Sequence, residues 1–135
     1  MIADAPASVT LVVPSDVRFH RSVRLAVGGL ATLVGFDIEA IEDLRIGVDE
    51  LCGALGEAGN GDPISFEIVT AIDSSIRIVG TTPLGTDDSD ADRFAFSRQI
   101  LSVVADDYGL DVDGPIVRCW LDRSLGDREL VANPS

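Results

Sequence analysis

The stretch that decides the fold runs from Asp37 to Glu57 and reads Asp-Ile-Glu-Ala-Ile-Glu-Asp-Leu-Arg-Ile-Gly-Val-Asp-Glu-Leu-Cys-Gly-Ala-Leu-Gly-Glu. Asp is a favourable residue at the start of a helix because its side chain can accept a backbone N–H of the first turn. The apolar residues that follow occupy more than one helical face, so we expect a deeply packed helix over 37–57. These apolar residues are Ile38, Ile41, Leu44, Ile46, Val48, Leu51, Cys52 and Leu55.

A strand and another helix are expected before this segment. Residues 8–13 read Ser-Val-Thr-Leu-Val-Val and end at Pro14, which is typical of a strand that stops at a proline. Ser15 then suits the N-cap of a helix over 16–34, and Gly35 suits its left-handed end. The apolar face of this helix is expected to hold Val17, Val23, Val27, Leu30 and Leu33.

The second half of the chain alternates between strand and helix patterns. We expect antiparallel hairpins and one further helix, with strands at 64–72, 75–80, 110–113 and 115–122, a polar loop at 81–92 and a helix at 93–108. The order is therefore β-α-α-β-β-α-β-β. That order predicts an α+β fold, a two-layer sandwich with helices on one face of a mainly antiparallel sheet.

The length of 135 residues is that of one domain, and we expect its core over about residues 8–123 and a flexible tail over 124–135. The chain carries 23 acidic and 10 basic residues, a net charge of -13, and every basic residue apart from one His is Arg. Such a surface repels phosphate backbones and anionic lipids, which argues against nucleic-acid and membrane-surface partners. No apolar run is long enough to cross a bilayer and the first residues do not resemble a secretion signal, so we expect a cytoplasmic protein.

The cysteines and the histidine do not form a recognisable metal-binding pattern. Cys52 and Cys119 lie far apart in apolar stretches, and His20 is the single histidine. A structural zinc site needs several such ligands at short spacings, so no metal site is expected. Both cysteines are expected to be buried as small apolar residues.

Residues 41–52 resemble the N-box helix of bacterial anti-sigma factors of the serine-protein kinase type. Those proteins belong to the ATPase superfamily that includes gyrase, histidine kinases and heat-shock chaperones. Residues 23–30 and the pair Gly35-Phe36 are similar to the first helix of that family and its exit, with a weaker likeness at 96–101. The resemblance implies the histidine-kinase-like ATPase fold over nearly the whole chain.

The resemblance also implies which positions would hold nucleotide, and this chain departs from the pattern at several of them. In the family, a Glu on the N-box helix acts as base and an Asn four residues later holds magnesium. Glu50 matches the Glu as a vestigial base, whereas Ala54 stands at the Asn position and has no oxygen to offer a metal.

Two further nucleotide-binding motifs of the family are altered. The Asp that recognises adenine falls at or near Thr82, and the glycine-rich lid reads Asp90-Ala91-Asp92-Arg93-Phe94-Ala95-Phe96. This segment has no pair of glycines, and its carboxylates would repel a triphosphate. ATP and magnesium are therefore expected to bind weakly or not at all, and serine-kinase activity is expected to be weak or lost.

The position that the family uses to bind its protein partners has a matching residue in this chain. The family uses an Arg on the first helix to grip a sigma factor and its antagonist in turn, and Arg24 matches it, with Arg21 one turn before. From the spacing alone, Arg24 could equally be a solvated charge or part of a local ion pair. The resemblance further implies a homodimer, formed through the sheet edge or the first helix.

Three functions are therefore compatible with the sequence. The leading hypothesis is an anti-sigma factor that sequesters an alternative sigma factor and is released by a STAS-domain anti-anti-sigma protein. The alternatives are an active ATP-dependent serine kinase that phosphorylates the STAS antagonist, and a nucleotide-independent signalling module with another partner.

Overall fold

The computed structural model describes residues 5–85 and 94–126 of the chain. Three helices, one 3₁₀ turn and five strands follow one another in the described part. Their bounds are β1 (Ala7–Val13), η1 (Val17–Phe19), α1 (His20–Val34), α2 (Ile38–Ala58), β2 (Ile64–Ala71), β3 (Ser75–Pro83), α3 (Ala95–Val104), β4 (Asp107–Asp113) and β5 (Ile116–Ser124).

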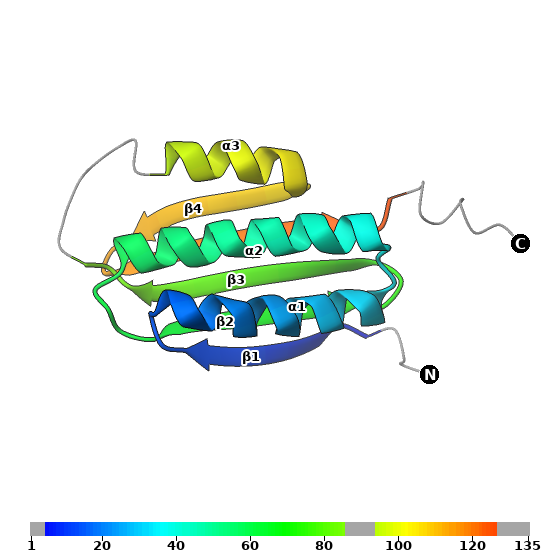
Figure 1. Cartoon of the computed structure of the whole chain (residues 1–135), viewed down its shortest axis with the longest axis horizontal. Helices are drawn as coiled ribbons and strands as arrows, with labels where there is room; N and C mark the ends of the chain where they lie inside the picture. The colour runs from blue at the N-terminus through cyan, green and yellow to red at the C-terminus, as the bar shows by residue number, and fades with distance from the viewer. Residues whose placement is uncertain (1–4, 86–93, 127–135) are drawn as a thin grey trace, which may run out of the picture.

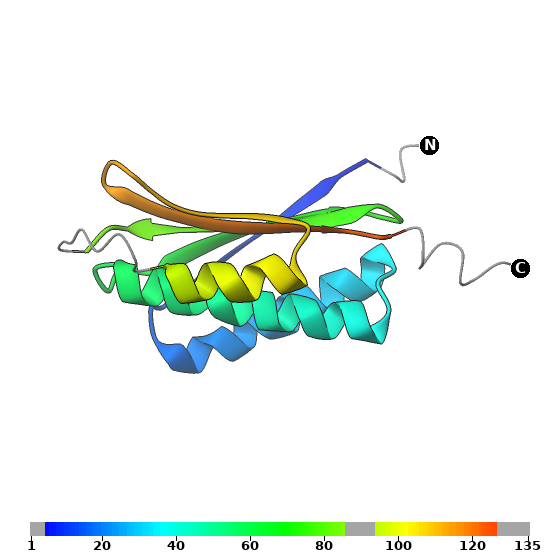
Figure 2. The same cartoon turned by 90° about the horizontal axis from the view of Figure 1, so that it is seen from above.

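The strands form one antiparallel sheet in the order β1-β2-β3-β5-β4. All three helices lie on one face of this sheet, with α2 between α1 and α3, and the other face carries no helix of the described chain (Figures 1 and 2). The expected α+β two-layer sandwich and its order of helices and strands are confirmed. The strand β5 lies between β3 and β4 because the chain crosses over through α3 before it returns along the sheet.

The two long helices begin and end largely as their sequences predict. The Asp37 carboxylate accepts the backbone N–H of Ala40 at 2.9 Å, and Gly35 ends α1 with a φ of 113°. Such a φ favours Gly because it has no Cβ. The start of α1 differs from the expectation, since Asp16 rather than Ser15 caps the preceding 3₁₀ turn through the N–H of Arg18.

The core lies between the sheet and the buried faces of the helices. The expected apolar faces are correct at Val23, Val27 and most positions of α2. They are wrong at four residues that were expected to be buried and are exposed. The exposed fractions are 72% for Val17, 58% for Leu33, 79% for Ile38 and 46% for Ile46. Ala31 and Val34 take the buried positions of α1 instead.

The sheet places alternate residues against the helices. Ile64, Phe66 and Ile68 of β2 are buried, as are Ile76 and Ile78 of β3, which confirms the predicted alternation. The hairpin between these strands turns at residues 73–74, where Ser74 donates its backbone N–H to the Ala71 carbonyl at 2.9 Å.

Three predicted boundaries are wrong. The third helix was expected to reach Tyr108, but α3 ends at Val104 and Asp107 already begins β4, because residues 107–113 pair with β5. The strand β3 continues to Pro83 through its pairing with both β2 and β5, beyond the expected end at residue 80. Ser124 belongs to β5, and Leu125 donates to the Ser74 carbonyl, so both lie within the fold rather than the tail.

Candidate functional site

The first helix meets the second through a pair of charged residues. Arg24 on α1 donates from Nη1 to Oδ1 of Asp49 on α2 at 2.7 Å, with the two side chains 34% and 47% exposed. A guanidinium has five N–H donors, so this contact leaves donors of Arg24 available to a partner. The ion pair that the sequence left as one alternative for Arg24 is therefore present, and it fixes the guanidinium at the surface between the helices.

Arg21 lies one turn earlier on α1 and is exposed. Within residues 5–85 and 94–126, no hydrogen bond or ion pair engages its side chain. His20 is half-buried nearby, and its pKa is lowered mainly by burial. We call His20, Arg21, Arg24 and Asp49 the seam cluster, because they follow the line along which α1 and α2 meet.

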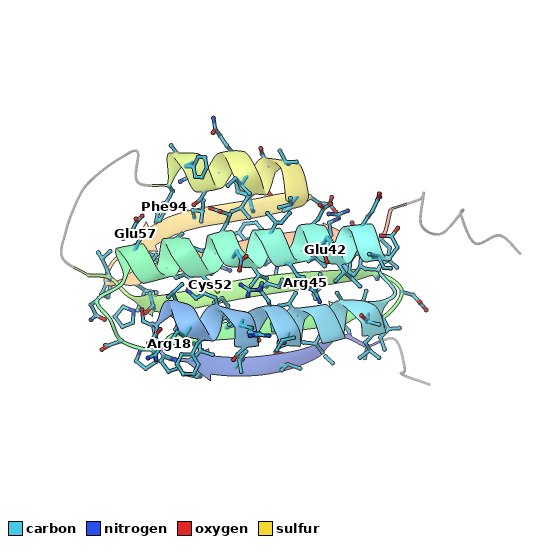
Figure 3. The ribbon with its side chains drawn as sticks, in the orientation of Figure 1. Arg18, Glu42, Arg45, Cys52, Glu57 and Phe94 are labelled. Atoms are coloured by element: carbon cyan, nitrogen blue, oxygen red, sulfur yellow. The ribbon has the colours of Figure 1, made fainter. Side chains whose placement is uncertain are left out.

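Beside the seam cluster the two helices leave a shallow depression of about 410 Å³. It is lined by Leu25, Gly28 and Thr32 of α1 and by Ile38 and Arg45 of α2, among others. Arg45 lies between the two helices (Figure 3), where Gly28 leaves room for its guanidinium and Glu42 accepts its hydrogen bond at 3.0 Å. Leu25 and Ile38 expose large apolar side chains at this surface.

Glu50 lies on a different side of α2, towards α3. Its Oε1 accepts a hydrogen bond of 3.0 Å from the hydroxyl of Ser97 on α3. A carboxylate that holds a hydroxyl has the contact that a general base needs, but the hydroxyl here belongs to the chain itself. Ala54 lies one turn later on α2 and is only 5% exposed.

Thr82 is also enclosed. It is 3% exposed, and its Oγ1 lies 3.2 Å from the carbonyl oxygen of Pro63, to which it donates. Gly59 packs so closely that a Cβ there would lie 2.9 Å from Cγ2 of Thr82. The Thr82 hydroxyl is therefore satisfied inside the fold and does not face an open pocket.

Close to Thr82, backbone hydrogen bonds join the end of α2 to the end of β3. Gly85 donates to the Ala58 carbonyl at 2.8 Å and Asn60 donates to the Pro83 carbonyl at 3.1 Å, so the end of α2 is fastened to the end of β3. We call residues 58–60 with residues 83–85 the closed joint.

These contacts allow a direct test of whether the described residues fit a magnesium nucleotide. Magnesium requires oxygen ligands, and Ala54 presents a methyl group at the position that would supply one. Thr82 and Ala54 are both sealed by protein atoms, and the Glu50 carboxylate holds Ser97. The described residues therefore do not fit the group. Most of the expected lid, Asp90-Ala91-Asp92-Arg93, lies outside the described residues.

The two cysteine thiols lie inside the fold. Burial raises the pKa of both Cys52 and Cys119 to about 12, and both thiols are fully buried, as the sequence predicts. In the part of the chain that the structure describes, no three His, Cys, Asp or Glu side chains are grouped as metal ligands. None of the described helices has the length and apolar character that a bilayer crossing requires.

The sequence predicts the helices that carry Arg21, Arg24, Glu50 and Ala54, but it places Thr82 in a polar loop over 81–92, whereas Thr82 lies in strand β3. The structure does not bring these candidate residues together at one site. Arg21 and Arg24 lie at the seam of α1 and α2, whereas Glu50 and Ala54 face α3 and Thr82 lies at the end of β3. The partners Asp49 and Ser97 were missed. The sequence offered a reason to consider Asp49, because it stands beside Glu50 in the stretch that resembles the N-box helix. It offered none for Ser97, which lies 47 residues from Glu50.

A comparison with protein-family models finds no match, and a comparison with curated proteins finds none either. Among solved structures, the chain is similar to the crystal structure of the RsbU and RsbW domains of Rv1364c from Mycobacterium tuberculosis, with a TM-score of 0.70 and 13% sequence identity. The match covers 89% of this chain and 33% of that chain, so this chain spans one third of its length. At this identity the likeness establishes the fold, which is the histidine-kinase-like ATPase fold.

Proposed function

We propose that this chain is an anti-sigma factor that acts by binding. It sequesters an alternative sigma factor in the cytoplasm and releases it when a STAS-domain protein takes the same surface. The observation that carries the proposal is the combination of the ATPase-like fold with enclosed, ligand-poor residues at the nucleotide positions, Ala54 and Thr82. Sequestration needs complementary surface rather than bond chemistry, so a chain of this kind can work without a cofactor.

Two lines of support point to this class of partner. The resemblance of residues 23–52 to anti-sigma serine kinases comes from the sequence, and the similarity of fold to a structure that contains an RsbW domain is independent of it. Residues 23–52 form most of α1 and the first two thirds of α2, and the similarity of fold covers 89% of the chain.

The seam cluster is the proposed binding surface. It presents Arg21, whose side chain has no hydrogen bond or ion pair with any described residue, and Arg24, which Asp49 holds at the surface. The adjacent Leu25 is 63% exposed and supplies apolar area beside the two cations. A partner with carboxylates around an apolar anchor fits this surface, because charge fixes orientation and the apolar contact supplies affinity.

The experiment is to recover the tagged chain from its native host and to identify its partners by mass spectrometry. The proposal expects a sigma factor and a STAS-domain protein in separate complexes. Purified partners are then titrated against Arg24→Glu and Arg21→Glu, each of which inverts a charge at the contact and should weaken binding at least about tenfold.

Arg118→Glu is the matched control for both substitutions. Arg118 lies on β5 on the sheet face without helices, beside Trp120, so inverting its charge should leave both complexes intact. Full binding by Arg24→Glu and Arg21→Glu together, or recovery of neither kind of partner, would contradict the proposal. Recovery of another partner through the same two arginines would support the nucleotide-independent signalling module instead.

The kinase alternative rests on Glu50, which still holds a hydroxyl at hydrogen-bond distance. If the chain transfers phosphate to a STAS protein, Glu50→Gln abolishes the transfer. Under the binding proposal, no phosphate appears on the STAS protein with the wild-type chain and Glu50→Gln sequesters the sigma factor as well as the wild type does.

A further inference from the structure

The ion pair between Arg24 and Asp49 is a single-point contact. Arg24 reaches Asp49 through Nη1 alone, at 2.7 Å. Arg77 on β3, in contrast, donates to both carboxylate oxygens of Asp122 on β5, from Nε at 2.6 Å and from Nη2 at 2.9 Å. Within the described residues, Nε and Nη2 of Arg24 donate to no acceptor. Since two-point contacts are the stronger kind, the edge of Arg24 that makes them is still open.

Both members of this ion pair are accessible from solvent. The side chain of Arg24 is 34% exposed and that of Asp49 is 47% exposed. An ion pair with this exposure contributes little to stability, because water screens the charges and both side chains lose freedom. Asp49 also accepts no second hydrogen bond from residues 5–85 or 94–126. The fold therefore depends little on this carboxylate.

Asp49 nevertheless has a large effect on the charge of the seam cluster. The pKa of His20 is lowered from 6.5 mainly by burial, and Asp49 raises it while Arg24 lowers it. His20 is therefore uncharged at neutral pH, and Arg21 and Arg24 are the cations of the cluster. Asp49 offsets one of these two charges, so removing its charge doubles the net positive charge of the cluster.

We propose that Asp49 competes with a carboxylate of the bound partner for Arg24. In the free chain, Asp49 supplies the carboxylate that Arg24 contacts. In the complex, a carboxylate of the partner takes the edge formed by Nε and Nη2, which is the edge that Arg77 offers to Asp122. The inference rests on the proposed function, because it takes Arg24 as a contact to the partner.

The competition follows from the charges. Two carboxylates beside one guanidinium repel each other, and at this short range salt screens the repulsion only in part. Asp49 therefore weakens the complex, and it also provides Arg24 with a counter-charge whenever the partner leaves. Both effects shorten the lifetime of the complex, which suits a surface that two partners occupy in turn.

The alternative role for Asp49 is to position Arg24 for the partner. Asp49→Asn separates the two roles, because the amide oxygen of Asn can still accept the hydrogen bond from Nη1 while the charge is removed. Asn and Asp have similar helix propensities, so α2 should be preserved. Competition predicts that Asp49→Asn strengthens binding, whereas positioning predicts unchanged or weaker binding.

The test measures the binding kinetics of the purified chain and the sigma factor recovered from its host. Asp49→Asn should slow dissociation at least about threefold, because a repulsion inside the complex is removed. Asp122→Asn is the matched control, since it removes the same charge from an Arg–Asp pair on the sheet face without helices. In an Arg24→Ala background, Asp49→Asn should leave the dissociation rate unchanged, because no shared contact remains.

A second measurement uses the purified chain without a partner. Phenylglyoxal modifies the uncharged form of an arginine side chain, and a neighbouring carboxylate makes this form scarcer. Arg24 should therefore react faster in Asp49→Asn than in the wild type, whereas the rate at Arg21 should change less. Mass spectrometry of the digested chain gives both rates, and an equal rate at Arg24 in the two proteins would overturn the inference.

The kinetic outcomes distinguish this inference from the proposed function. Dissociation that Asp49→Asn leaves unchanged or accelerates, or that Asp122→Asn slows equally, would overturn the inference and leave the proposed function standing. If the wild-type chain forms no complex with a sigma factor or a STAS-domain protein, the proposed function fails and the inference fails with it.

Discussion

Ser97 on α3 donates its hydroxyl to Oε1 of Glu50 on α2 at 3.0 Å, and this contact joins two helices through residues that lie 47 positions apart in sequence. The Glu50 carboxylate therefore serves as an acceptor within the fold. Together with the closed joint, the contact fastens α2 to α3 at one position and to β3 at another.

Removing the Ser97 hydroxyl should lower stability. Ser97→Ala leaves the partly buried Glu50 carboxylate without this donor, and we expect the free energy of unfolding to fall by about 1 kcal/mol. Urea denaturation measures the change, and a double-mutant cycle with Glu50→Gln separates the pairwise part. Ser102→Ala is the control, because the Ser102 hydroxyl donates to the Gln99 carbonyl of its own helix. Equal effects at both serines would contradict the assignment.

Two glycines of α2 should respond to alanine in opposite directions. A Cβ at Gly47 would lie 2.6 Å from Cδ2 of Leu121, whereas a Cβ at Gly53 would meet nothing within 4 Å. Gly47→Ala should cost about 1–3 kcal/mol through overpacking. Gly53→Ala should add about 0.5–1 kcal/mol, because Ala is the better helix former. Thermal unfolding of both variants checks the contrast, and a loss of stability in Gly53→Ala would count against the described packing.

Much of this fold follows from local sequence signals. The cap at Asp37, the turn at residues 73–74 and the left-handed Gly35 each depend on neighbouring residues, and each was predicted correctly. The end of α3 was not predictable in this way. Residues 105–108 contain no Gly or Pro to stop a helix, and the pairing of β4 with β5, a tertiary interaction, decides their conformation.

The pH dependence of stability should show the contact between Asp16 and Arg18. Hydrogen bonds from the Arg18 side chain and backbone lower the pKa of Asp16 from its ordinary value of 3.8 to about 2. The unfolded chain therefore binds more protons here than the folded chain between these values. The stabilising contribution is complete above the ordinary pKa and is lost as the pH falls towards 2.

Asp16→Asn provides the comparison for this prediction. The variant lacks the titrating group, so the difference in melting temperature between wild type and variant should be largest near neutral pH and should shrink in acid. A difference that stays constant down to the acid limit of folding would contradict the lowered pKa.

The cysteines should be unreactive in the folded protein. Burial raises the pKa of Cys52 and Cys119 to about 12, so the nucleophilic thiolate is scarce and shielded. Iodoacetamide at about pH 8 should leave both unmodified in native buffer and modify both in urea, as mass spectrometry would reveal. Rapid labelling of either thiol under native conditions would contradict their burial.

The candidate site was only partly accessible from sequence. Helical spacing placed Arg21 and Arg24 on one helix, but it could not predict that Asp49 would hold Arg24 while Arg21 has no ion pair among the described residues. Motif matching located Thr82, yet its burial depends on Gly59, which the closed joint places beside it, and on Pro63, which precedes β2 and is brought near by the pairing of β2 with β3. Contacts between segments that are distant in sequence decide which of the matched positions are still accessible to a ligand or partner.

The central claim is that this scaffold binds its partner without a nucleotide. The most direct measurement is the affinity of the purified chain for the sigma factor recovered from its host, titrated with and without millimolar magnesium ATP. The account predicts a saturable complex whose affinity is the same in both conditions. A complex that forms only with magnesium ATP, or the absence of any sigma-factor complex, would contradict it.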